Sequence, residues 1–243
     1  MATGRNHRRR PEHADLPLAR RAVALLIAAG LLLAMWVAIT LGRAESLGDG
    51  VLEDQVEWQG RQAKSGELPS LREWEESFAE LAQARRLDPR NPQLAEQLGQ
   101  LYLASVKNGN EVTAFGARAI EPFAEAVAMR PSSPYAWANL AWAKYYSGQV
   151  DKVFYAALAN AARLGPWEKE IQLMVVDLGL ALWNDLPADL RADVSVVAGN
   201  AQFRMATEVV AIGQKRGRLD EVCGLEKTRL TETCKSFARD ANG

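Results

Sequence analysis

Ala-Val-Ala-Met-Arg-Pro, at residues 126–131, is the stretch that decides the fold of this chain. It closes a segment whose apolar residues recur at helical spacing, and its proline ends that helix and lets another begin. Two other segments close in the same way, with Ala-Arg-Arg-Leu-Asp-Pro at 84–89 and Ala-Ala-Arg-Leu-Gly-Pro at 161–166. From Ser70 onward no long stretch alternates with period two, so we predict an all-α domain.

The spacing of these prolines predicts a repeat. Pro89 and Pro131 lie 42 residues apart, and Pro131 and Pro166 lie 35 residues apart. The chain resembles the tetratricopeptide repeat (TPR) family, whose helix pairs recur about every 34 residues. The residues that match the family pattern are Ala84, Pro89, Leu98, Gly99, Tyr102, Ala119, Phe123, Ala126, Pro131, Trp137, Leu140 and Ala141. The resemblance covers residues 70–165 and implies a TPR-like α-solenoid of stacked helical hairpins.

The chain departs from the family pattern at two places. Lys-Asn-Gly-Asn at 107–110 belongs to an insertion, which predicts a longer loop between paired helices over 106–118. After Pro166 the register drifts. The helices expected there span residues 167–185, 187–216 and 219–238. We therefore assign TPR-like repeats to 70–166, and degenerate helical repeats with a C-terminal cap to 167–243, because an array must cover its last apolar face.

A second decisive stretch is AVALLIAAGLLLAMWVAITL at residues 22–41, which contains no charge. As an α-helix it would span about 30 Å, the thickness of the hydrocarbon core of a bilayer. Six arginines precede it, at positions 5, 8, 9, 10, 20 and 21, whereas Arg43 is the one basic residue close behind it. This asymmetry predicts a single-pass transmembrane helix in the bacterial inner membrane, with residues 1–21 as a cytoplasmic basic tail and the C-terminal domain in the periplasm.

Two alternatives compete with this anchor. A cleaved signal peptide would have a shorter apolar core, of about 7–15 residues, and a better cleavage site than residues 38–44 offer. A buried helix of a soluble core is the other alternative, but a helix that is apolar all round and flanked by arginines suits lipid better. Between anchor and repeats, residues 42–69 are polar and glycine-rich, so we expect a juxtamembrane linker with a short helix near 51–63.

The two cysteines, Cys223 and Cys234, both lie in the part expected outside the cytoplasm, where the compartment is oxidising. In one continuous helix they would be about 16 Å apart, too far for a disulfide. A bond therefore needs a chain reversal, which Gly224 could help to form. We expect a disulfide that staples the cap, and two separate thiols are the alternative. Metal binding is disfavoured, because two sulfurs without a histidine leave a zinc site half built.

Composition argues against several functions. Six of the 29 basic and two of the 30 acidic residues lie in the first 42 positions, so the rest of the chain carries 23 basic and 28 acidic residues. That net charge of minus five disfavours nucleic acid as a partner. The only histidines are His7 and His13, and the chain has no glycine-rich phosphate loop, HExxH or G-x-S-x-G pattern. We therefore expect no enzyme activity, no cofactor and no metal.

A binding role is the better prediction, because stacked helix pairs leave a concave groove lined by the first helix of each pair. The helix expected to begin at Pro134 has two apolar faces, one of them rich in the aromatic residues that most often anchor interfaces. The residues expected in a partner groove are Gln93, Glu96, Gln100, Tyr135, Ala138, Trp142, Tyr145 and Tyr146. The alternative is that Trp142 and Tyr145 pack against neighbouring helices.

Residues 161–187 are similar to anchored repeat proteins of bacterial exopolysaccharide biosynthesis and export, through the letters AARLGPWE, LGL and LP. The resemblance implies a non-catalytic scaffold whose protein partners are polysaccharide polymerase or export subunits in an inner-membrane complex. The same plan also resembles accessory subunits or chaperones of protein-export and cytochrome-maturation machines. A third alternative, an enzyme acting on glycan, would need a carboxylate pair such as Glu75 and Glu76, or Glu168 and Glu170, facing one cleft.

Overall fold

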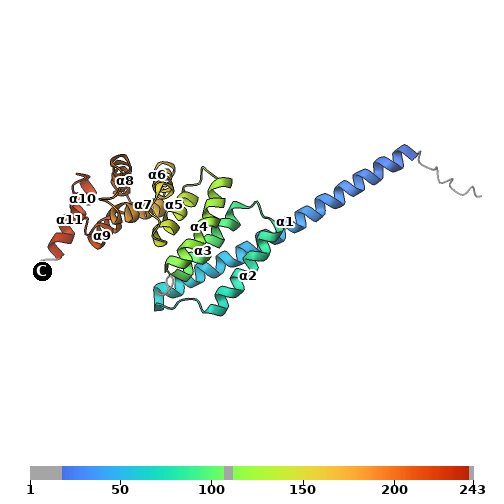
Figure 1. Ribbon diagram of the computed structural model, residues 1–243, viewed down its shortest axis with the longest axis horizontal. Helices are drawn as coiled ribbons and strands as arrows, with labels where there is room; N and C mark the ends of the chain where they lie inside the picture. The colour runs from blue at the N-terminus through green and yellow to red at the C-terminus, as the bar shows by residue number, and fades with distance from the viewer. Residues whose placement is uncertain (1–17, 107–111, 241–243) are drawn as a thin grey trace, which may run out of the picture.

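The computed structural model describes residues 18–106 and 112–240, and within them it contains eleven α-helices and no strand (Figure 1). The prediction of an all-α chain is confirmed for these residues. Most of the expected cytoplasmic tail, with His7 and His13, lies outside the described residues, as does the insertion at 107–110. In Figure 1 the helices follow one another along the molecule, from the first half of α1 at one end to the C-terminus at the other.

The first helix, α1 (Leu18–Ser65), is 48 residues long and runs without a break from the apolar stretch into the helical domain. Its first half stands away from the other helices in Figure 1, and its most apolar window is not buried at all. By length and composition this helix can cross a membrane. The apolar stretch and part of the folded domain are therefore one continuous helix.

The second half of α1 corrects the linker expected over residues 42–69. This half is helical to Ser65 and packs against α2 (Leu71–Leu87) and α3 (Pro92–Val106). Its buried residues are Ala44, Gly48, Val51, Gln55 and Trp58. They recur at alternating intervals of four and three and so lie on one narrow face of the helix. The other faces are largely polar, which is why the segment resembles a linker in the sequence.

Polar contacts at its N-terminal end hold α2 against α1. A capping box begins α2, because the Ser70 side chain accepts from the Glu73 N–H and the Glu73 carboxylate accepts from the Ser70 N–H at 2.8 Å. The same carboxylate accepts from Arg61 of α1 at 2.6 Å. Hydrogen bonds from Ser70 and then from Arg61 lower the pKa of Glu73 to about 2. Further along the pair, Ser77 donates to Asp54 of α1 at 2.6 Å.

The next helices are α4 (Val112–Met129), α5 (Pro134–Tyr146) and α6 (Lys152–Leu164), and each packs against its neighbour in the chain. The prolines at positions 89, 131 and 166 lie in the connections before α3, α5 and α7 (Lys169–Ala181). The longer loop expected over 106–118 is corrected, because α4 already begins at Val112. Three alanines between residues 114 and 119 favour the helical conformation there.

The C-terminal part contains more breaks than the sequence predicted. Its helices after α7 are α8 (Ala188–Ala201), α9 (Ala206–Lys215), α10 (Leu219–Cys223) and α11 (Thr228–Asp240). The helix expected over 187–216 is divided by residues 202–205, and the helix expected over 219–238 is divided by residues 224–227. The second break is a chain reversal in which Glu226 has a φ of 52°. It brings Cys223 and Cys234 together in the expected disulfide, with their Cα atoms 6.1 Å apart.

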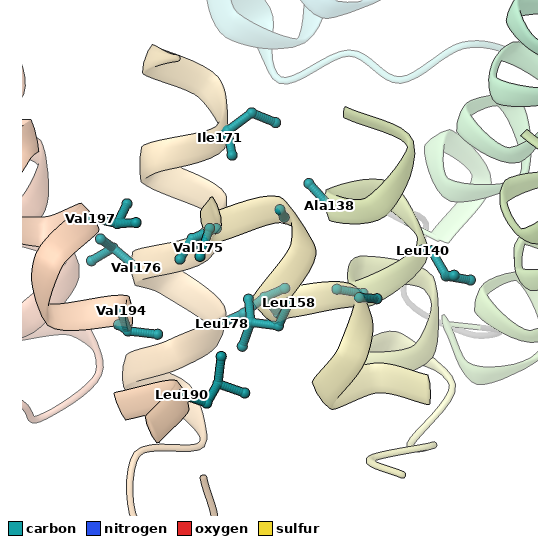
Figure 2. Packing of buried hydrophobic residues seen from close by; sticks show 14 of the residues in the cluster. Ala138, Leu140, Leu158, Ile171, Val175, Val176, Leu178, Leu190, Val194 and Val197 are labelled. Atoms are coloured by element: carbon teal, nitrogen blue, oxygen red, sulfur yellow. The ribbon is translucent and has the colours of Figure 1, made fainter. Parts of the chain in front are cut away.

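The core runs along the molecule instead of gathering at one centre. Buried hydrophobic residues from α3 to α11 form one cluster, and a smaller cluster joins α1, α2 and α3. Figure 2 shows the middle of the larger cluster, where Leu158 of α6 lies beside Leu178 of α7, and Val176 of α7 lies beside Val197 of α8. Helices α1, α3, α5, α7, α9 and α11 each contact the next member of that series. These odd-numbered helices form a continuous row.

Candidate binding groove

An open cavity of about 570 Å³, which we call the groove, lies along the row formed by α1, α3, α5 and α7. The connection between α1 and α2 completes its wall. The lining residues are Leu52, Gln55, Val56, Trp58, Gln59, Gln62, Leu68, Pro69, Gln100, Leu103, Ala104, Asn139, Trp142, Tyr146 and Met174. Because six of these belong to α1, the helix that can cross a membrane also forms one side of the groove.

None of the described residues that line the groove carries a charge. Its polar groups are mainly the amides of Gln55, Gln59, Gln62, Gln100 and Asn139, and most of the remaining wall is aliphatic or aromatic. On α1 the side chains of Leu52 and Val56 remain 40% and 62% exposed. An ionic ligand would lose its hydration here without meeting an opposite charge. The groove therefore suits a neutral ligand that is at least partly apolar.

Aromatic rings from α5 form another part of the groove wall. Trp142 stacks on Tyr146 with ring centroids 4.9 Å apart, and Tyr145 meets Trp142 edge-on at 6.3 Å. The opposite face of α5 is occupied by Leu140, which is buried in the larger core cluster. With one face in the core, the α5 rings are held at a fixed position beside the groove.

Two nitrogen atoms at the groove are buried and have no hydrogen-bond partner, Nε2 of Gln55 and Nε1 of Trp142. Gln55 is only 6% exposed. Folded proteins pair nearly all of their buried donors, because an unpaired one costs roughly 1–3 kcal/mol. Both atoms are N–H donors that are closed off from solvent, so they lie within the wall of the groove and do not face its open space.

The structure brings three of the eight residues expected in a partner groove to this site: Gln100, Trp142 and Tyr146. The other five, which lie outside it, are Gln93, Glu96, Tyr135, Ala138 and Tyr145. The groove borders only the C-terminal turns of α3 and α5, where α1 passes, and most of the five belong to earlier turns of those helices. The cavity is shifted along both helices relative to the expected partner groove, which itself stays a prediction.

The surroundings of these five residues explain their positions. Ala138 is 1% exposed and belongs to the core. The Tyr135 hydroxyl donates to Glu168 at 3.4 Å on the surface before α7, and Gln93 lies in the first turn of α3. Burial raises the pKa of Glu96, which lies near Arg130. Tyr145 and Trp142 are both half-buried and packed against the core cluster, as the alternative of packing against neighbouring helices expects, and Trp142 also lines the groove.

The groove residues of α1 could not be named while residues 42–69 were assigned to a linker. A signal for them exists, since Leu52, Val56, Gln59 and Gln62 follow one another at intervals of four and three. This spacing places them on one helical face, next to the buried face that begins at Ala44. Together, this row of residues and the buried face that begins at Ala44 would have indicated a helix with two packed faces.

A partly buried ion pair lies beside the aromatic rings and joins three of the odd-numbered helices. Arg216, at the end of α9, donates from Nε and Nη2 to the two carboxylate oxygens of Asp177 in α7, at 2.8 and 2.7 Å. Its guanidinium lies 5.9 Å from the centre of the Tyr145 ring in α5. The hydrogen bond to Asp177 raises the pKa of Arg216. Its role is to fix α9 against α7 and α5.

The described residues form an all-helical fold, with one helix long and apolar enough to cross a membrane and an uncharged cavity beside that helix. Within the described part of the chain, no group of three or more His, Cys, Asp or Glu residues could hold a metal ion. No protein family, no curated protein and no solved structure matches this chain. We therefore infer function from the groove, the first helix and the order of helix packing.

Proposed function

We propose that this chain is a single-pass protein of the bacterial inner membrane, whose TPR-like periplasmic domain binds a partner protein in the groove. It acts as a non-catalytic scaffold in exopolysaccharide biosynthesis and export. The observation that carries the proposal is a neutral, aromatic groove with one wall formed by the anchoring helix. A partner bound there is held close to the membrane.

The order of helix contacts supports the TPR-like array. Each helix packs against its neighbour in the chain, and each odd-numbered helix packs against the next odd-numbered helix. Repeats that touch only adjacent repeats have this arrangement, and their first helices line a concave surface. The groove lies along α1, α3, α5 and α7, which would be the first helices of four successive pairs.

Charge supports the proposed orientation. The arginines at 20 and 21 directly precede the uncharged stretch, with further arginines before them, whereas Glu45, Asp49, Glu53 and Asp54 follow it. Positive residues are retained on the cytoplasmic side of a membrane helix. The disulfide between Cys223 and Cys234 fits an oxidising compartment on the opposite side.

The link to exopolysaccharide rests on the resemblance of residues 161–187, and it makes polymerase or export subunits the proposed partners. The alternative is an accessory subunit or chaperone of a protein-export or cytochrome-maturation machine. The apolar, uncharged lining of the groove favours this alternative as well, because unfolded client segments expose apolar side chains.

The test is photocrosslinking in cells with the full-length chain. A photoreactive amino acid replaces Gln59, an exposed residue of the groove, and a matched chain carries it at Val196, which is 59% exposed on α8 outside the groove. We expect polysaccharide polymerase or export subunits to be captured at position 59 and not at 196. Capture of protein-export subunits would support the alternative, and equal capture at both positions would contradict a groove-based scaffold.

A further inference from the structure

We infer that the turn between α2 and α3 is a second point of contact with the membrane. Arg86 and Arg90, together with Arg43 of α1, bind the phosphate of an anionic phospholipid headgroup there. This inference rests on the proposed function, because it requires α1 to cross the bilayer. Three observations carry it: the continuity of α1, the antiparallel register of α1 and α2, and the exposure of three arginines that have no ion pair.

The antiparallel pairing of α1 and α2 returns the chain to the end of the uncharged stretch. The contacts that set the register are Arg61 with Glu73, Asp54 with Ser77, and Gly50 with Glu80. Residue numbers therefore fall along α1 as they rise along α2. The last residue of α2, Leu87, reaches the same core cluster as Ala44, and Figure 1 shows this end of α2 beside the point where α1 leaves the folded domain.

The start of α3 confines the turn to the same level. A Cβ atom at Gly48 of α1 would lie 2.6 Å from the side chain of Leu94, in the first turn of α3. Residues 88–91 connect Leu87, near Ala44, to this second contact. Arg86 and Arg90 are therefore carried to the part of α1 that directly follows the uncharged stretch.

Helix geometry places this part of α1 among the lipid headgroups. Arg43 follows Leu41, the last residue of the uncharged stretch, by two residues, or about 3 Å along the helix axis. The headgroup layer extends roughly 5–8 Å beyond the hydrocarbon core on each side of a bilayer. A long arginine side chain at this level can direct its guanidinium toward a lipid phosphate.

The charges at this level are available to an external anion. Arg43, Arg86 and Arg90 are exposed, and none of them forms an ion pair within the described part of the chain. Two carboxylates, those of Glu45 and Asp88, adjoin the three arginines in the sequence, so positive charge is in excess here. The chain beyond residue 42 as a whole carries minus five. The end nearest the uncharged stretch therefore differs in sign from the rest of the domain.

The residue type favours phosphate as the ligand. A guanidinium presents N–H donors in a planar fork that matches two phosphate oxygens, and it stays charged at any physiological pH. A lipid headgroup is favoured over a free phosphate ion, because the membrane helix keeps the arginines within the headgroup layer, where the effective concentration of lipid phosphate is high. Each basic residue near an anionic bilayer strengthens this attraction about fivefold.

The test uses the full-length chain in bilayer nanodiscs that contain equal amounts of phosphatidylglycerol and phosphatidylcholine. Mass spectrometry of the protein after mild detergent extraction gives the ratio of the two lipids that remain bound. We expect phosphatidylglycerol to exceed phosphatidylcholine for the unmodified chain. Arg86→Gln and Arg90→Gln should each lower the ratio two- to fivefold, because each removes one charge from the headgroup layer.

Two kinds of control variant accompany these substitutions. Arg86→Lys and Arg90→Lys keep the charge and should keep most of the preference for phosphatidylglycerol. Arg204→Gln removes an exposed arginine between α8 and α9, far along the chain from α1, and should leave the ratio unchanged. Since none of these side chains is buried, the melting temperature should stay the same in all five variants.

The outcomes separate this inference from the proposed function. Equal amounts of the two lipids on the unmodified chain would overturn it, as would glutamine variants that keep the full ratio. A loss in the lysine variants or in Arg204→Gln as large as in Arg86→Gln would also overturn it. All of these results leave the proposed groove scaffold intact, because the crosslink at position 59 tests that separately. A chain that does not enter the bilayer would overturn both.

Discussion

At the scale of single residues, glycines set how closely two pairs of helices approach. A Cβ atom at Gly99 of α3 would lie 2.6 Å from the ring of Phe123 in α4, and one at Gly179 of α7 would lie 2.6 Å from Val194 in α8. Phe123 is fully buried and has no space to withdraw into. Gly60 of α1 differs, because nothing lies within 4 Å of a Cβ there.

The same substitution should therefore have opposite effects at two of these glycines. Gly99→Ala should destabilise the domain by about 1–3 kcal/mol, because the methyl group overpacks a tight interface. Gly60→Ala should stabilise it by roughly 0.5–1 kcal/mol, because alanine loses less backbone entropy in a helix. Urea unfolding followed by circular dichroism would measure both. Equal shifts of the two midpoints would show that the close approach at Gly99 has no energetic weight.

At the scale of secondary structure, α11 is the helix most dependent on a covalent link. It packs against α9 and α10 through buried Leu230 and half-buried Phe237, at the end of the row. Its disulfide to α10 closes a short loop across the reversal at residues 224–227. Because α11 contacts only two other helices and depends on one disulfide, we expect it to unfold locally before the other helices.

Replacing both Cys223 and Cys234 by serine should lower the free energy of unfolding by about 2–3 kcal/mol, the value typical of a short disulfide loop. Amide hydrogen exchange should accelerate most in α11, while α5 and α6 keep their protection, since local stability follows local contacts. Reduction of the unmodified chain serves as the control and should reproduce the pattern. Uniform acceleration along the chain would show that the bond stabilises the whole domain.

Elements ended by prolines could be predicted from the sequence, whereas elements ended by tertiary contacts could not. The apolar periodicity before Pro89, Pro131 and Pro166 was enough to place the C-terminal ends of α2, α4 and α6, because a proline ends a helix locally. The second half of α1 carries no such marker, and its buried face includes Gly48 and Gln55, which do not identify a core helix. The break between α8 and α9 was missed for the same reason.

The candidate site was predictable only on one side. Trp142 and Tyr146 lie on the second apolar face of α5, and Gln100 lies on the neighbouring helix α3. Helical periodicity in the sequence was therefore enough to predict these three residues. The opposite wall depends on α1 lying along the row of helices, a long-range contact with no local signature. The wall formed by α1 therefore cannot be predicted from the sequence until it is known which helices pack together.

At the scale of the whole molecule, the uncharged stretch and the C-terminal cap lie at opposite ends (Figure 1). If the arginine tail stays in the cytoplasm, the groove and the cap both lie outside it. A reporter enzyme that is active only outside the cytoplasm, fused after residue 243, should then be active in intact cells. A fluorescent protein that matures only in the cytoplasm should be dark at the same position. The reverse pattern would place the helical domain inside the cell.

Because α1 is one unbroken helix, a change in the direction of its first half also moves its second half. A membrane helix changes its tilt when the thickness of the surrounding lipid changes. Because the groove begins beyond the apolar stretch on the same helix, it must move with that tilt. At about 30 Å from the bilayer, a tilt of about 10° displaces a point on the helix sideways by roughly 5 Å, more than the rise of three residues. Under the proposed membrane insertion of α1, lipid composition would set which neighbours the groove can reach.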